Sequence, residues 1–112
     1  MPEYTKSERA KLRDLASEAY ERELGARLAE LEKSFAAWRR GKLLSSELSG
    51  EIHEFHQHTA RDVWSSYQLP HPAMIVARAV AAGILEAREI PTPLLEKLKD
   101  EIAVLKRVKS AV

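Results

Sequence analysis

Residues 24–38, LGARLAELEKSFAAW, decide the fold. Their apolar residues recur in a 4-3-4-3 spacing, at Leu24, Leu28, Leu31, Phe35 and Trp38. On an α-helix, with about 3.6 residues per turn, this spacing forms one continuous stripe. Such a stripe is typical of a helix that packs lengthwise against another helix. The stretch therefore predicts a helix and a helical neighbour for it.

The same helix is predicted to extend over residues 6–40. This range lacks proline, holds a single glycine, and is rich in Ala, Leu, Glu, Lys and Arg, which favour helices. An earlier apolar set at Leu12, Leu15 and Ala19 has the same spacing but is out of phase with the later stripe. The phase slips between Ala19 and Leu24. Either one long helix rotates its buried stripe there, as at a stutter, or the helix kinks or breaks.

Glycine, serine and proline separate the remaining helices. Gly41 and the Ser45-Ser46 pair indicate a loop and a helix cap. A second helix is predicted over 46–67, because Pro70 and Pro72 disfavour helical geometry in the residues before them. A third, mostly buried helix is expected over 72–82 and a last one over 93–110. The last helix carries its own stripe, at Leu95, Leu98, Ile102, Leu105 and Val112.

No strand pattern or internal repeat is evident in the sequence. The expected fold class is all-α, a small bundle of four or five helices in one domain spanning 1–112, with a long N-terminal helix that the phase slip could kink and a long C-terminal helix. The length of 112 residues, with 45% hydrophobic and 31% charged residues, is ordinary for a single soluble domain.

Composition excludes several function classes. The 18 basic and 17 acidic residues are spread without a basic face, so no nucleic-acid partner is expected. The chain has no cysteine, which excludes disulfides, thiolate metal sites and a catalytic thiol. The charged N-terminus lacks the apolar core of a signal peptide, and the longest apolar run, 73–85, is too short to span a bilayer. A cytoplasmic protein without a membrane partner is expected.

Residues 51–62, EIHEFHQHTARD, hold three of the four histidines and raise the question of a metal or active site. At ~100° per residue, one arc of the helix forms a predicted core face made of Leu48, Ile52, Phe55, Thr59, Val63 and Tyr67. His56 falls inside that arc and His53 at its edge, whereas His58 points to the far side. The three imidazoles are therefore not expected to converge.

Two candidate sites remain on this helix. The ligand-binding candidates are His53, His56, Arg61, Trp64, Tyr67 and His71. The candidates for binding Mg²⁺ or Mn²⁺, which prefer oxygen ligands, are Glu51, Glu54, His58 and Asp62. Each set can also be explained by a structural role without any function. His56 could be a hydrogen-bonded core histidine, and the acidic set could be a solvated helix face with an i, i+4 pair between Glu54 and His58.

Known catalytic templates do not match the chain. HEFH places its histidines three apart, where the zincin pattern needs four. No glutamate is followed three residues later by a histidine, as di-iron bundles require. No glycine-rich phosphate loop and no nucleophile elbow are present. These failures favour a non-enzymatic function, and no cofactor is expected.

The protein is expected to act by association. The partner expected first is a second copy of the chain, which would form a homo-oligomer, and the other possible partner is a different protein. The stripes at 24–38 and 95–112 are longer than a small bundle needs for its own core. Trp38, Arg39 and Arg40 are candidate anchors, since Trp and Arg are enriched at interfaces. The alternative is a ligand- or metal-dependent helical enzyme or sensor with its site on the helix at 46–67.

Overall fold

The structure, a computed structural model, describes residues 3–111, and their side chains through residue 108. Over this range it is helical and contains no strand, which confirms the all-α fold class. The first helix is α1 (Lys6–Arg39). A second continuous helix is formed by α2 (Ser45–Glu54), the π-helical turn η1 (Phe55–Thr59) and α3 (Ala60–Ser66). The chain continues with α4 (Pro72–Ala81), the short 3-10 turn η2 (Ala87–Glu89) and α5 (Thr92–Ala111).

The predicted helix bounds agree with the structure to within one residue at each described end. The long helix α1 is uninterrupted, so the predicted alternative of a break next to Gly25 is wrong. The Ser45-Ser46 pair does not occupy the cap position of the second helix. That position belongs to Leu44, whose amide N–H donates to the Glu47 carboxylate at 2.9 Å. Val112, the last residue of the predicted C-terminal stripe, lies outside the described residues.

The chain groups into two compact units. The first combines the described parts of Met1–Ala19 and Leu69–Val112, and the second is Tyr20–Gln68. The division within α1 falls at the predicted phase slip. The early stripe of Leu12, Leu15 and Ala19 is buried in the first unit, and the later stripe belongs to the second. The slip therefore marks a change of packing partner along one helix. That residues 1–112 form a single domain stays a prediction.

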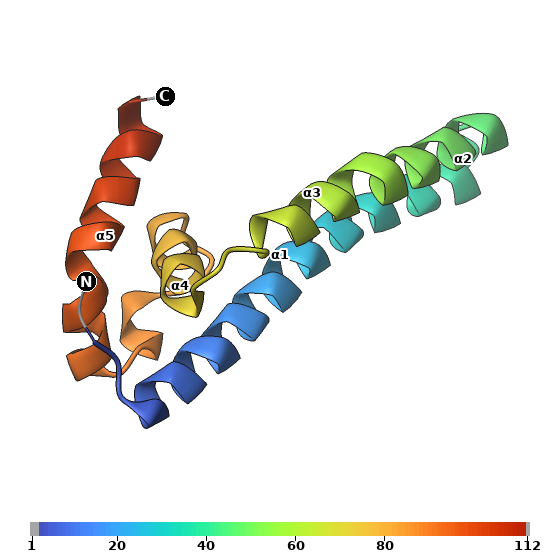
Figure 1. Cartoon of the computed structure of the whole chain (residues 1–112). Helices are drawn as coiled ribbons and strands as arrows, with labels where there is room; N and C mark the ends of the chain where they lie inside the picture. Colours follow the sequence, from blue (N-terminus) through green and yellow to red (C-terminus); the bar gives the residue numbers. More distant parts are fainter. Residues whose placement is uncertain (1–2, 112) are drawn as a thin grey trace. The chain divides into compact units, whose positions relative to one another are not determined.

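The first unit holds most of the buried core. Its helices α4 and α5 pack against each other (Figure 1). Its largest fully buried side chains are Leu12, Val76, Leu85, Leu94 and Leu98. Six of the ten residues of α4 are buried, which confirms the prediction that this helix is buried on most sides.

A polar cluster joins the start of α1 to α5 within the first unit. Thr5 and Glu8 form a capping box, in which each backbone N–H donates to the other's side chain, at 2.9 and 3.0 Å. The Lys97 ammonium donates to the Glu8 carboxylate at 2.6 Å and to the Glu3 carbonyl at 2.9 Å. One lysine thus ties α5 to the capped end of α1.

The second unit is a helical hairpin. The part of α1 that follows Tyr20 lies antiparallel beside the helix of α2, η1 and α3 (Figure 1). The chain reverses at Gly41, whose φ of +73° is a conformation that other residues adopt only with strain. Ser34 donates to the Glu51 carboxylate at 3.1 Å, and the Trp38 indole N–H donates to the Ser45 hydroxyl at 2.9 Å.

The open end of the hairpin is held by aromatic residues. The Tyr67 hydroxyl donates to the Glu23 carboxylate at 2.8 Å. The Tyr67 ring also meets the Tyr20 ring edge-on, with 5.2 Å between centroids. Polar and aromatic contacts thus connect the two helices at both ends, although few apolar side chains are buried between them.

Candidate functional site

Exposed apolar side chains are concentrated on the hairpin. Of the 16 hydrophobic residues that are buried among those described, only Leu48 and Val63 belong to the second unit. By contrast, six of the eight large hydrophobic side chains that are exposed belong to it, namely Leu28, Phe35, Trp38, Leu44, Ile52 and Trp64. Two helices side by side can cover only one side of each other, so a hairpin alone leaves such residues in water. The hairpin is therefore the region whose apolar surface lacks cover.

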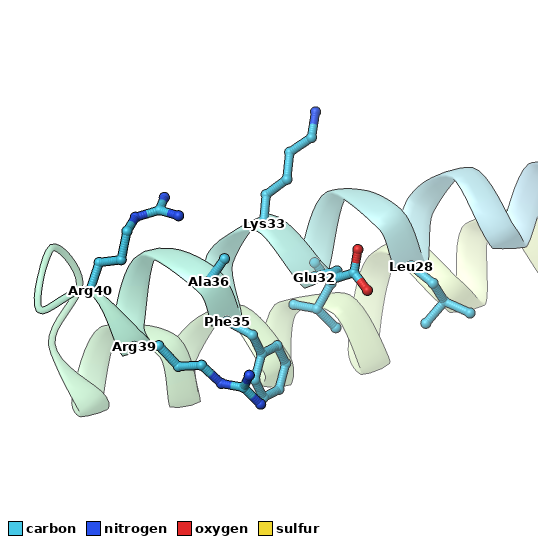
Figure 2. A pocket seen from close by; sticks show the side chains of 8 residues that line it. Leu28, Glu32, Lys33, Phe35, Ala36, Arg39 and Arg40 are labelled. Atoms are coloured by element: carbon cyan, nitrogen blue, oxygen red, sulfur yellow. The ribbon is translucent and has the colours of Figure 1, made fainter.

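One such surface is the face of α1 shown in Figure 2, which we name the α1 outer face. It forms an open groove of about 750 Å³. The groove is lined by Leu28, Leu31, Glu32, Lys33, Phe35, Ala36, Arg39 and Arg40. Figure 2 shows Leu28, Phe35 and Arg39 on one side of the helix, whereas Lys33 and Arg40 extend away from them.

The predicted stripe is only partly covered by the second helix of the hairpin. Leu24 and Leu31 are half-buried, but Leu28 is 47% exposed and Phe35 36%. The reason is angular. At ~100° per residue, Leu28 and Phe35 stand to one side of Leu24 and Leu31, next to Glu32 and Arg39. The sequence predicted the stripe, and the structure shows which edge of it stays open.

The predicted anchors Trp38, Arg39 and Arg40 are exposed. The Trp38 side chain is oriented by its hydrogen bond to Ser45 and still exposes 40% of its surface. A large aromatic side chain held in one orientation can contact a partner with little further loss of conformational entropy. Trp38 is not among the residues that line the groove of the α1 outer face, so it is a separate exposed side chain three residues before the Gly41 turn.

The histidine segment differs from its predicted geometry. His56, which was predicted to lie within the core face, is exposed, and so is Ile52. The arc assumed a regular α-helix, but Phe55–Thr59 form a π-helical turn, which holds more residues per turn and changes the direction of the side chains that follow. In addition, a single neighbouring helix cannot cover an arc of that width. The prediction for His56 is wrong for both reasons.

The histidines and carboxylates of this segment do not converge. His53, His56 and His58 are all exposed, and the His58 Nδ1 lies 2.9 Å from a Glu54 carboxylate oxygen. Within the described part of the chain, no three His, Asp or Glu side chains are grouped so that they could hold a metal ion. Glu51 accepts a hydrogen bond from Ser34 instead.

Polar grooves separate α1 from the second helix of the hairpin. The larger, of about 330 Å³, is lined by Glu23, Arg27, Glu30, Thr59, Asp62, Val63 and Ser66. Arg27 and Glu30, both on α1, pair with each other at 3.2 Å along one side of it. Asp62 therefore lies among groups from α1 rather than with Glu51, Glu54 and His58.

The ligand-binding candidates are similarly spread. Trp64 is 52% exposed and Arg61 is exposed, whereas Tyr67 is half-buried and engaged with Glu23 and Tyr20. His71 is exposed and belongs to the first unit, so it is not part of the hairpin.

The structure adds an apolar groove that the sequence did not indicate. It lies in the first unit, measures about 380 Å³, and is lined by Leu69, Met74, Arg78, Asp100, Glu101, Val104 and Leu105. Val104 lies off the stripe predicted for the last helix, and it is 48% exposed. Only Leu105, which is on that stripe, could have suggested this surface.

Comparisons with protein families, with curated proteins and with solved structures find no match to this chain. None of the described helices has both the length and the apolar character needed to cross a membrane.

Proposed function

We propose that this protein acts by association, binding a protein partner through the α1 outer face of its hairpin. The partner is a second copy of the chain or another protein. The observation that carries the proposal is the placement of Leu28 and Phe35, two large apolar side chains that stay exposed on one side of a long helix. Exposed apolar surface of this kind, rimmed by charged residues, marks interaction sites.

The shape of the hairpin supports the same conclusion. A helix normally buries its apolar stripe against another element, and the second helix of the hairpin covers only the edge at Leu24 and Leu31. A third helical surface placed on the α1 outer face would cover the other edge. Arg39 and Arg40 at the rim supply hydrogen-bond donors of the type that interfaces use.

Replacing Phe35 tests whether this face is available for association. In Phe35→Ser the free energy of unfolding of the monomer should fall by no more than about 2 kcal/mol, less than for a fully buried phenylalanine, because the side chain is 36% exposed. Association should weaken strongly, because a polar residue now sits at the centre of the face. Chemical denaturation at low concentration gives the first quantity, and sedimentation velocity over a wide concentration range gives the second.

The opposite pattern would contradict the proposal. If the Phe35→Ser monomer lost about 3 kcal/mol or more, the ring would be packed inside the chain and the face would not be open. Val104→Ser is the matched control, since Val104 is similarly exposed but belongs to the first unit. This variant should associate as the unaltered chain does.

A further inference from the structure

Two of the charged residues on the α1 outer face, Glu32 and Arg39, stand on opposite sides of Phe35 along the helix. Leu28, Glu32, Phe35 and Arg39 fall within an arc of about 60° at ~100° per residue. Glu32 and Arg39 are seven residues apart, or about two turns. The midpoint between them lies between Phe35 and Ala36, so a negative and a positive group stand at equal distances from the apolar centre.

We propose that the partner of the α1 outer face is a second copy of this chain, placed antiparallel on it, with Glu32 of each copy beside Arg39 of the other. This inference rests on the proposed function. A two-fold axis passing between Phe35 and Ala36 carries each Glu32 onto the position of the other copy's Arg39. The same residues then serve both copies, as an isologous interface requires.

The charge order excludes the parallel arrangement in the same register. Two copies running in the same direction would place Glu32 beside Glu32 and Arg39 beside Arg39, and like charges at such positions repel. In the antiparallel arrangement both contacts are attractive. At the axis the two Phe35 side chains, about 1.5 Å apart along the helices, meet each other and form the apolar centre of the interface.

The two charged groups are available for this pairing. Glu32 and Arg39 are both exposed, and neither side chain takes part in a hydrogen bond or ion pair within the described residues. Their neighbours Arg27 and Glu30, by contrast, already pair with each other at 3.2 Å. Association in the antiparallel register therefore adds two ion pairs without breaking one in the monomer.

Charge reversal in the full-length chain tests the register. Glu32→Arg alone and Arg39→Glu alone should each raise the dimer dissociation constant at least ~10-fold, because each substitution creates two like-charge contacts across the axis. The swap Glu32→Arg/Arg39→Glu restores both contacts and should return the constant to within about threefold of the original. Sedimentation equilibrium measures these constants, and circular dichroism verifies that each variant keeps its helices.

A matched double variant separates register from net charge. Glu32→Arg/Arg61→Glu has the same net charge as the swap, but Arg61 is exposed on α3 and does not line the groove of the α1 outer face, so this variant should dimerise as weakly as Glu32→Arg alone. Equal recovery in both doubles would overturn the antiparallel register. The register would also be overturned if the single charge reversals left the dimer unchanged while Phe35→Ser separated it. In that case association through the α1 outer face would still stand. A chain that is monomeric at every concentration would overturn the second copy as the partner, whereas a destabilised Phe35→Ser monomer would overturn the proposed function itself.

Discussion

Lys97 lowers the pKa of the Glu8 carboxyl below its usual range, chiefly through their hydrogen bond, and the backbone N–H of Thr5 lowers it further. A carboxyl group with a lowered pKa in the folded state stabilises the fold above its unfolded pKa. This contribution is lost as the pH falls through the folded pKa. At the scale of single residues, protonation of Glu8 at low pH should therefore weaken the contact between α1 and α5.

Replacing Glu8 should remove that part of the acid sensitivity. In Glu8→Gln the free energy of unfolding should be lower than in the unaltered chain at neutral pH, and the difference should begin to shrink as the pH falls toward the usual carboxyl pKa of 4.5 and shrink further as the pH falls through the lowered pKa. Urea denaturation at a series of pH values measures this. Glu96→Gln is the control, because Glu96 is exposed and, among the described residues, pairs with Lys99 alone, at 3.4 Å. Parallel pH curves for Glu8→Gln and the unaltered chain would contradict the assignment.

His56 provides a second residue-scale prediction. Because its side chain is exposed, His56→Leu should change the free energy of unfolding by less than about 0.5 kcal/mol. A buried, hydrogen-bonded histidine would instead cost about 1–3 kcal/mol when its partner is left unsatisfied. Thermal and urea unfolding distinguish the two. A loss in the larger range would mean that His56 has a partner that stabilises the hairpin.

At the scale of elements, the hairpin depends on a turn that follows α1 directly. Gly41 has a φ of +73°, and a Cβ atom added there would meet no neighbour within 4 Å. A substitution at Gly41 is therefore opposed by backbone strain rather than by crowding. Gly50 offers a contrast, since it lies inside α2 and also has open space around it.

The two glycines should respond oppositely to the same substitution. Gly41→Ala should destabilise the chain by roughly 1 kcal/mol, the cost of a left-handed conformation for an L residue. Gly50→Ala should stabilise it by about 0.5–1 kcal/mol, because alanine loses less backbone entropy in a helix. Chemical denaturation of both variants measures the signs. Destabilisation by Gly50→Ala would indicate that something packs on that part of α2.

The positions of the helices were predictable, but the π-helical turn was not. Proline, serine and glycine near the ends set the helix bounds, and apolar spacing marked the stripes. The turn at Phe55–Thr59 depends on a shift of backbone hydrogen bonds, for which FHQHT offers no sequence signal. Because Ile52 precedes this turn, its exposure follows from the single neighbouring helix alone, whereas both features bear on His56.

At the scale of the whole molecule, burial is divided unevenly between the two units. The first unit buries 14 of the 16 buried hydrophobic residues among those described, whereas the hairpin buries Leu48 and Val63. Stability of a helix pair comes mainly from packing, so the hairpin should gain more than the first unit does from an added surface. Phe35→Ser and the single charge reversals should accordingly act mainly on association through the hairpin.

The sequence by itself determined where the helices begin and end, the two stripes of α1, and the slip between them near Gly25. These features depend on residues within a few turns of one another. Only the tertiary structure decided which stripe positions are covered. Leu31 is half-buried and Phe35 exposed because of where the second helix of the hairpin packs, and that helix follows the Gly41 turn in the chain. The exposed histidines and the open α1 outer face follow from that arrangement, because one neighbouring helix covers only one side of another.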